Sequence, residues 1–237
     1  MFTDIHSHII PFVDDGTSNY EDAVRMLKEE TKNNVDKIIL TPHYHKSVFE
    51  TSQGIIKFEF ENLKKKINEE NLNIKLYLGQ EIYVSKRINI IDKLENNEVL
   101  TMNGTKYILV EFSTKDEYDV CELVYTLGLR GYIPIIAHIE RYPYLRELET
   151  IEEIKRLGGL LQINASSLTG KEGATCKKVA IALLKKGFVD FVSSDIHSFR
   201  ENEMQKVYNF ICKKFGVTYA EQLFYLNANR IIETKEE

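Results

Sequence analysis

The stretch YILVEFSTKDEYDVCELVYTLGLRGYIPIIAHI, residues 107–139, contains two short apolar runs separated by a longer amphipathic segment. The runs at 107–112 and 133–139 are almost continuously apolar, which is typical of strands buried on both faces. The segment 117–130 between them predicts a helix. A strand, a helix and a second strand in this order predict a parallel pair joined by a crossover helix.

The same alternation continues along the whole chain. Five further strands are expected at FTDIH (2–6), KIILTPH (37–43), IKLYLGQEI (74–82), LLQINA (160–165) and FVDFVSSDI (188–196). Further helices are expected over 18–33, 52–70, 85–94, 144–157, 172–187 and 200–215. The Asn-Gly pair of MNGT, 102–105, predicts a tight turn before the fourth strand. Seven strand–helix units predict an α/β fold, a distorted (β/α)7 TIM-like barrel.

Length and composition limit the classes of protein that fit. The chain has 237 residues, 43% of them hydrophobic, and shows no linker or low-complexity segment, so we expect one domain over 1–237. A net charge of -5 and a pI near 5.8 argue against nucleic acid as a partner. No apolar run approaches the ~20 residues that span a bilayer, and the N-terminus lacks the features of a secretory signal.

The three cysteines, at 121, 176 and 212, are widely spaced and odd in number. They predict a reducing, cytoplasmic location without a disulfide framework. A phosphatase with a cysteine nucleophile carries an arginine six residues after the cysteine, in the loop that cradles phosphate. Leu127, Ala182 and Thr218 occupy those positions here, so this mechanism is excluded.

Polar residues gather where the expected strands end. Every histidine of the chain lies at such a place, together with several carboxylates and one arginine. These residues are His6, His8, His43, His45, Glu81, Glu111, His138, Glu140, Arg141, Asp195 and His197. In a (β/α) barrel the C-terminal ends of the strands form the active-site mouth. So many charges converging on one mouth would be costly unless cations compensated them.

The types and spacing of these residues point to a metal centre. Residues i and i+2 of a strand face the same side, so His6 and His8, or Asp195 and His197, can bind one ion or neighbouring ions. Imidazole and carboxylate ligands without thiolates suit Mn, Fe, Zn or Co and favour a hydrolytic site over a closed structural zinc site. The set is too large for one ion, which indicates two or three that share bridging carboxylates.

The motifs HSH, TPHYH, GQE, AHIER and SDIH, in this order, resemble those of the PHP (polymerase and histidinol phosphatase) superfamily. The blocks DIHSHIIPFVDDG, LTMNGTKYILVEF, AHIERY and LNANRII resemble its bacterial manganese-dependent protein-tyrosine phosphatases of the capsular and exopolysaccharide type. The resemblance covers almost the whole chain. It implies a PHP-type distorted (β/α)7 barrel that holds three metal ions, with Mn²⁺ preferred and Fe, Zn or Co possible.

The resemblance also implies how the ligands divide among the ions. The first ion would be held by His6, His8, Glu81 and Asp195; the second by Glu81, Glu111 and His138; the third by His43, His197 and Asp15, with Asp14 as a near alternative to Asp15. Many members of the superfamily carry histidine where this chain has Glu111. An anionic ligand there favours a harder, more Mn-like ion. His45 matches no ligand motif.

Phosphate-ester hydrolysis suits such a centre. Metal ions lower the pKa of a bound water, so that hydroxide forms near neutral pH, and neutralise phosphoryl oxygens. Arg141, Asp195 and His197 are the candidate catalytic residues. Arg141, three residues after His138, is expected to grip phosphate, with an ion pair to Glu140 or Glu147 as its structural alternative. Arg200 is a second candidate for phosphate, or else caps the next helix or lies in solvent.

The function implied is hydrolysis of phosphotyrosine on a polysaccharide-regulating bacterial tyrosine kinase. The alternative is a small-molecule phosphomonoesterase such as a histidinol phosphatase. Glu111 and the AHIERY block argue against this alternative. A catalytically inactive protein that keeps the barrel only for binding would lack some metal-ligating residues, and none of these is missing from the motifs. Tyr44, Phe49, Phe12 and Tyr142 flank the motifs and either form an aromatic rim or pack in the core. The sequence assigns no general acid and no oligomeric state.

Overall fold

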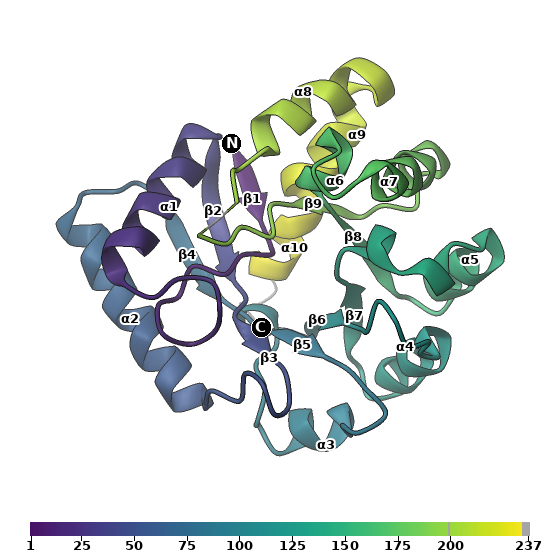
Figure 1. Cartoon of the computed structure of the whole chain (residues 1–237), viewed down its shortest axis with the longest axis horizontal. Coiled ribbons are helices and arrows are strands. Elements are labelled where there is room, and N and C mark those ends of the chain that lie inside the picture. The colour runs from purple at the N-terminus through teal and green to yellow at the C-terminus, as the bar shows by residue number, and fades with distance from the viewer. Residues whose placement is uncertain (199, 234–237) are drawn as a thin grey trace.

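The computed structural model describes residues 1–198 and 200–233, and its strands form a ring surrounded by helices (Figure 1). The strands are β1 (Phe2–Asp4), β2 (Val35–Leu40), β3 (His43–Tyr44), β4 (Lys75–Leu78), β5 (Glu81–Tyr83), β6 (Tyr107–Glu111), β7 (Ile133–Ile136), β8 (Leu160–Asn164) and β9 (Phe191–Ser193). All paired strands are parallel, in a sheet of order β1-β2-β4 and a sheet of order β3-β5-β6-β7-β8-β9.

Two of the expected strands are each divided into two. KIILTPH forms β2 and β3, and IKLYLGQEI forms β4 and β5. Pro42, between β2 and β3, has no N–H to donate to a neighbouring strand, so the ladder is interrupted there. Hydrogen bonds still cross the break, from Gly79 N–H to Leu40 O at 2.8 Å and from Glu81 N–H to Pro42 O at 3.2 Å.

Backbone hydrogen bonds also join the two ends of the strand series. Asp195 N–H donates to the carbonyl of His6 at 2.9 Å, and His8 N–H donates to that of Ile196, also at 2.9 Å. The residues just after β9 therefore lie beside those just after β1, and the ring has seven strand positions. The expected distorted (β/α)7 barrel is confirmed.

The helices follow the expected alternation. They are α1 (Tyr20–Lys32), α2 (Gln53–Glu69), α3 (Ile90–Glu95), α4 (Val120–Leu129), α5 (Leu148–Arg156), α6 (Ala165–Thr169), α7 (Ala174–Lys186), α8 (Met204–Phe215), α9 (Val217–Glu221) and α10 (Asn227–Glu233), with a π-helical turn at Gln222–Leu226. Short 3-10 turns occupy Met102–Gly104, Ile139–Arg141 and Pro143–Leu145. The turn at MNGT is confirmed, with Asn103 and Gly104 both at positive φ.

Three predicted helix starts are wrong by four residues or more. The helix expected over 85–94 begins only at Ile90, because the Asn89 side chain caps it by accepting from the N–H groups of Ile91 and Asp92. The helix expected from 200 begins at Met204, and the one expected from 144 begins at Leu148 after a 3-10 turn. The helices α6, α9 and α10 are not among those predicted, since each is too short to show a clear period.

The hydrophobic core has two parts. The larger lies between the strands and the surrounding helices, and α1, for example, buries Ala23, Met26 and Leu27 against it. The smaller fills the inside of the ring with Ile5, Ile39, Leu109, Ile135 and Phe191, and it includes Ile231 of α10. The block LNANRII therefore packs against the interior of the barrel, away from the C-terminal strand ends.

Within the residues that the structure describes, no helix is both long and apolar enough to cross a membrane. The predicted domain, 1–237, includes residues 199 and 234–237, which lie outside the described part of the chain.

Candidate metal centre

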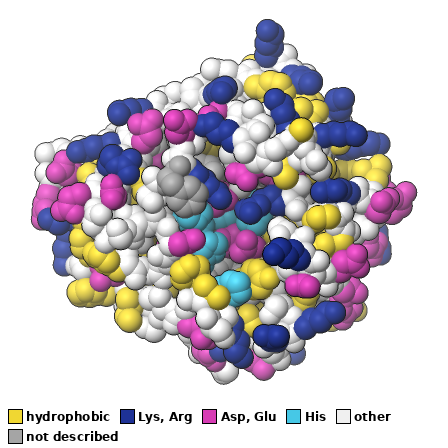
Figure 2. All heavy atoms as spheres, viewed as in Figure 1, with side chains coloured by type: hydrophobic (Ala, Val, Ile, Leu, Met, Phe, Trp, Pro, Cys, Tyr) yellow, Lys and Arg dark blue, Asp and Glu magenta, His cyan; other side chains and the backbone are white. Residues whose placement is uncertain are grey.

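The polar strand ends identified in the sequence meet at one end of the barrel. Figure 2 shows histidine side chains gathered in a hollow near the middle of one face, with acidic and basic side chains around them. The residues come from β3, β5 and β6 and from the segments just after β1, β7 and β9. Two of them, His138 and Asp195, have positive φ values of 34° and 49°. This conformation is uncommon for residues other than glycine and turns the chain sharply at the mouth.

Four side chains that were expected to share an ion lie around the carboxylate of Glu81. His6 Nε2 is 3.2 Å from Glu81 Oε1 and 3.5 Å from Asp195 Oδ1. His8 Nε2 is 3.4 Å from Glu81 Oε2 and 3.6 Å from Asp195 Oδ1. The two imidazole Nε2 atoms are only 3.1 Å apart. All four side chains are almost completely buried.

Glu81 also faces the second expected group. His138 Nε2 lies 3.1 Å from Glu81 Oε1 and 3.6 Å from Glu111 Oε1. His43, expected only in the third group, takes part as well, since its Nδ1 lies 2.8 Å from Glu81 Oε2 and 3.9 Å from Glu111 Oε2. Glu81 is therefore common to both groups, and His43 lies between the second and the third.

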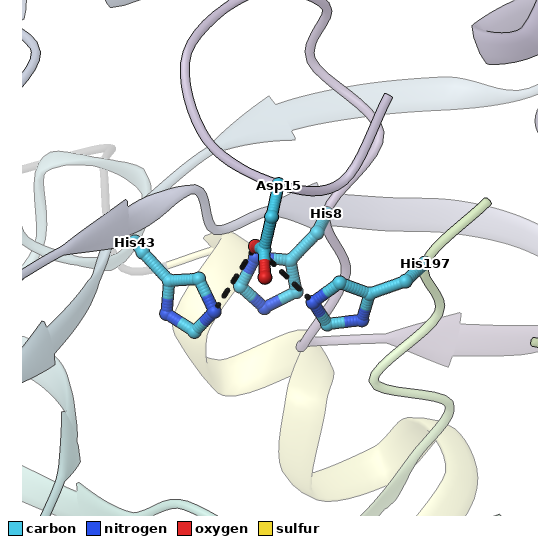
Figure 3. A group of neighbouring side chains, drawn as sticks. All are labelled: His8, Asp15, His43 and His197. Atoms are coloured by element: carbon cyan, nitrogen blue, oxygen red, sulfur yellow. Dashed lines mark ion pairs between the residues drawn. The ribbon is translucent and has the colours of Figure 1, made fainter. Parts of the chain in front are cut away.

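The third group is drawn in Figure 3, where His43 and His197 point at the carboxylate of Asp15 from two sides. Asp15 Oδ1 lies 3.6 Å from His43 Nε2 and 3.7 Å from His197 Nε2, and His8 completes this cluster of donor atoms. Asp15 is half exposed, so this part of the mouth is open to solvent.

Asp14, the alternative to Asp15, has a different place. Its Oδ2 accepts from His8 Nδ1 at 2.8 Å and from the backbone N–H of His43 at 2.9 Å, and its Oδ1 accepts from Gly16 N–H. Glycine is needed at 16 because a Cβ there would lie 2.1 Å from the carbonyl oxygen of His8. The turn VDDG thus directs Asp14 to the far side of His8 and Asp15 into the mouth.

Four of the histidines use Nδ1 to contact an atom that is not among the expected metal ligands. His6 Nδ1 contacts Gln162 Oε1 at 3.2 Å, and His8 Nδ1 contacts Asp14. His138 Nδ1 contacts the hydroxyl of Tyr142 at 3.3 Å, and His197 Nδ1 contacts the carbonyl of Asp195 at 3.1 Å. The oxygens beside His6, His8 and His197 only accept, so they place a proton on Nδ1 and leave Nε2 directed inward, as in metal-binding histidines. The Tyr142 hydroxyl can both donate and accept, so it orients the His138 ring without fixing its tautomer. This assignment follows from the hydrogen-bond partners.

Two amides on β8, which the sequence did not single out, connect three of these side chains. Gln162 Oε1 accepts from His6 Nδ1 and, at 2.7 Å, from the backbone N–H of His138. Gln162 Nε2 donates to Asn164 Oδ1, and Asn164 Nδ2 donates to Asp195 Oδ2, both at 2.8 Å. The available signal was two amides at alternate positions of the apolar run LLQIN, which share the face directed into the barrel.

The charges of the cluster are strongly coupled. Burial opposes a charge on His6, but Glu81 and Asp195 outweigh it and raise the pKa of His6 to about 9. Burial likewise opposes a charge on His43, whose pKa Glu81 and Glu111 raise to about 10. Burial and the neighbouring charge of Glu81 raise the pKa of Glu111 to about 8. The pKa of Glu81 itself is held well below its usual range by His6 and His43, despite its burial.

The two arginines lie beside Asp195. Arg200 Nη1 donates to the Asp195 carbonyl at 2.8 Å and pairs with its carboxylate. Arg141 Nη1 lies 3.9 Å from Asp195 Oδ2, and the ion pair of Arg141 is therefore with Asp195 and not with Glu140 or Glu147. The Arg141 side chain remains 30% exposed at the mouth. Burial lowers its pKa, but Asp195 and Glu111 outweigh this and keep the guanidinium charged.

The remaining candidates divide between core and rim. Tyr142 is fully buried, and its hydroxyl accepts from Phe112 N–H at 3.1 Å. Tyr44 is also buried, whereas Phe12 is exposed and Phe49 stacks on His43 with ring centroids 5.6 Å apart. His45 does not join the cluster and stacks on Tyr83 at 3.9 Å.

The donor atoms present fit divalent cations. The Nε2 atoms of His6 and His8 face each other at 3.1 Å, and each can offer a lone pair to a cation once any proton on it is displaced. Glu81 Oε2 is completely buried and, although His43 Nδ1 is near, it makes no hydrogen bond of acceptable geometry. Converging imidazole nitrogens and an unsatisfied buried carboxylate oxygen are what a cation would compensate.

We predict that Gln162→Met weakens metal binding by about 10- to 100-fold, because loss of the acceptor frees the His6 ring and the backbone of His138. Metal affinity, measured by calorimetry on the chelator-treated protein, tests this. Leu161→Met, on the other face of β8, is the control and should bind as the unaltered chain does. Equal affinities for the two variants would contradict the orienting role of Gln162.

We also predict that metal binding releases protons. At about pH 7.5 the metal-free His6 and His43 carry protons, since their pKa values lie above that pH, and a cation must displace them to reach the lone pairs. Affinity should therefore rise with pH between about 6 and 9. Calorimetry in two buffers of different ionisation enthalpy measures the proton count, and binding without proton release would refute the prediction.

Comparison with known proteins places the chain among described relatives. Residues 2–233 match the family described as capsular polysaccharide synthesis, CpsB/CapC. Tyrosine-protein phosphatase CpsB of Streptococcus pneumoniae is 34% identical over 97% of this chain and 97% of its own. Tyrosine-protein phosphatase CpsB of Streptococcus agalactiae is 33% identical over 97% of this chain and 98% of its own.

A solved structure has the same fold. It comes from work on YwqE from Bacillus subtilis and CpsB from Streptococcus pneumoniae, described as unique metal-dependent tyrosine phosphatases. It matches with a TM-score of 0.84 and 30% identity, and the match covers 92% of this chain and 89% of that one.

Proposed function

The chain belongs to the CpsB/CapC family of capsular polysaccharide synthesis, and we propose that it is a metal-dependent phosphatase that hydrolyses phosphotyrosine in proteins. The observation that carries this proposal is the convergence of imidazoles and carboxylates on Glu81, at a mouth that also presents Arg141. The centre supplies the groups that phosphate-ester hydrolysis needs, and its chemistry requires neither a serine nor a cysteine nucleophile.

We propose that three divalent ions are held here. His6, His8, Glu81 and Asp195 would hold one; Glu81, Glu111 and His138 a second; His43, His197 and Asp15 a third. The distances among these groups support the division, and the approach of His43 to Glu81 and Glu111 makes it a second candidate ligand for the middle ion. Mn²⁺ is the preferred ion because Glu111 adds a second carboxylate to the middle group, and Fe, Zn or Co are the alternatives.

Bound divalent ions would supply Lewis acidity, lowering the pKa of water and neutralising phosphoryl oxygens. The protein's own residues do the rest. Asp195 directs Oδ1 toward His6 and His8. Its Oδ2 accepts from Asn164 and pairs with Arg200. Asp195 therefore connects the first ligand group with the neighbouring side chains of β8 and of the segment after β9. His197, with Nδ1 held by the Asp195 carbonyl, keeps Nε2 directed at the exposed end of the centre.

Arg141 is the residue we assign to the phosphate group. Its planar guanidinium can donate to two phosphate oxygens at once, which matches the developing charge of the transferred phosphoryl group. The weak 3.9 Å contact with Asp195 and its partial exposure leave it able to turn toward a ligand. Arg200 is engaged more closely with Asp195, so we assign it a secondary role in phosphate binding. The phenol leaving group, with a pKa of about 10, needs less protonation than an alkoxide.

A small-molecule phosphomonoesterase, such as a histidinol phosphatase, is the alternative function. The exposure of Asp15 and Arg141 favours an open mouth that a side chain on a protein can enter. We therefore favour a phosphorylated protein as substrate. Within that class we propose a bacterial tyrosine kinase that regulates polysaccharide synthesis, in agreement with the family description.

We further propose a cytoplasmic location. The three cysteines are free and lie on separate helices, α4, α7 and α8, as in a protein of a reducing compartment. We also propose that the whole chain, 1–237, is one phosphatase domain, in line with the family match over residues 2–233.

The test is a comparison of rates on a phosphotyrosine peptide and on histidinol phosphate, with metal content measured on the same sample. We expect the peptide to be cleaved with the higher kcat/KM and the activity to require Mn²⁺ or a similar ion. EDTA should abolish it, and added Mn²⁺ should restore it. Activity that survives complete chelation would rule out the metal mechanism, and a preference for histidinol phosphate would favour the alternative function.

We predict that Arg141→Ala lowers kcat/KM by about 100-fold while the metal content is unchanged, since one charge-assisted contact to the reacting phosphate is lost. Arg146→Ala, five residues further on and exposed, is the control and should retain full activity. Steady-state rates on p-nitrophenyl phosphate together with metal analysis measure both effects. An unchanged rate for Arg141→Ala would remove Arg141 from phosphate binding.

A further inference from the structure

A groove of about 670 Å³ lies next to the metal centre. Its lining comes from the end of β5 and from the loops that follow β3, β5 and β6, namely residues 45–48, residues 83–88, and Ser113 with residues 116–118. The stacked rings of His45 and Tyr83, 15° from parallel, belong to it. Hydrogen bonds in both directions between the backbones of His45 and Phe49 fold the first loop into a tight turn, so this wall is well formed.

The groove continues the strands that build the metal centre. His43, Glu81 and Glu111 lie on the neighbouring strands β3, β5 and β6, with His43 paired to Glu81 and Tyr83 paired to Glu111. Two residues after each of them come His45, Tyr83 and Ser113, which line the groove. A step of two residues along a strand covers about 6.6 Å. This is comparable with the length of a tyrosine side chain, so a phosphotyrosine that reached the centre would leave its own backbone at the level of the groove.

The groove has a basic wall. Lys46, Lys86 and Arg87 line it, and all three are exposed. Among the residues that the structure describes, none makes an ion pair with these three side chains. Elsewhere on the surface, Lys64 and Lys66 pair with carboxylates three residues away, at 3.0 and 3.2 Å. These three side chains are therefore available to pair with a partner.

The wall formed by the loop after β6 is acidic. Asp116 and Glu117 lie there, and Asp116 accepts from the Ser113 hydroxyl at 3.1 Å within its own turn. The lining thus carries three permanent cations against two carboxylates, in a chain whose net charge is -5. A local reversal of the overall sign favours an anionic partner at this place.

We propose that this groove binds the polypeptide segment next to the phosphotyrosine, and that it selects segments carrying Asp or Glu. The inference rests on the proposed function, because it takes the metal centre as the place where the phosphate is bound. Contacts of this kind at a solvent-exposed rim contribute modestly to binding and act mainly on partner choice. They should therefore appear in KM for peptides that differ only in their flanking charges.

The experiment uses the full Mn²⁺-loaded chain and three phosphotyrosine peptides of equal length, with flanks of Asp and Glu, of Ala, or of Lys. For the unaltered chain we expect the lowest KM with the acidic peptide and the highest with the lysine peptide. In Lys86→Glu/Arg87→Glu, the ratio of kcat/KM for the acidic peptide to that for the lysine peptide should fall by about tenfold. The preference of the unaltered chain should weaken at about 0.5 M salt, because screening shortens the range of these charges.

The matched control is Lys185→Glu/Lys186→Glu, which makes the same change in net charge at adjacent exposed lysines in the last turn of α7. Its ratio should remain that of the unaltered chain. A KM independent of flanking charge, a preference for the lysine peptide, or equal ratios for the two double variants would overturn the proposal. Failure of the proposed function would look different, since none of the three peptides would then be cleaved while p-nitrophenyl phosphate still was.

Discussion

The carboxylate of Glu81 is the group on which the arrangement of this molecule depends. It is completely buried, and imidazole nitrogens of His6, His8, His43 and His138 lie within 3.4 Å of its oxygens. A buried charge is stable only when opposite charge and hydrogen bonds compensate it. Protonated histidines can do so in the metal-free protein and divalent cations in the loaded one. Each strand end of the mouth therefore contributes to the surroundings of one carboxylate.

The two ends of the barrel differ in composition and in role. At the N-terminal strand ends, α10 packs Ile231 into an apolar interior that also contains Ile5 and Leu109. At the C-terminal ends, the same strands present polar side chains to one mouth. Burial of apolar area stabilises the ring, and this stability can offset the cost of holding unpaired lone pairs and carboxylates close together at the other end. This agrees with the general rule for (β/α) barrels, in which residues at the N-terminal strand ends stabilise the fold and residues at the C-terminal strand ends form the active site.

The ring orientation of the histidines is as informative as their identity. An amide, a carboxylate, a phenol and a backbone carbonyl each contact one Nδ1 atom, and all four contacts leave Nε2 directed inward. The groups that contact Nδ1 therefore orient the Nε2 atoms toward one another before any ion is bound. The groove beside the metal centre is built from the next residues of the same strands, so recognition of a protein substrate and the chemistry on its phosphate share one framework.

The sequence by itself determined the strand–helix alternation, the seven-strand barrel and the place of all six histidines at strand ends, because period and strand polarity are local properties of the chain. The start of α3 at Ile90, set by a single capping side chain, was less accessible to such reasoning. Only the tertiary structure directed Asp15 into the mouth and Asp14 behind His8, paired Arg141 with Asp195, and set Gln162 against His6 across 156 residues of sequence. Which neighbour a polar side chain meets is decided by strand register and by the close packing of the ring, and neither can be read from one segment at a time.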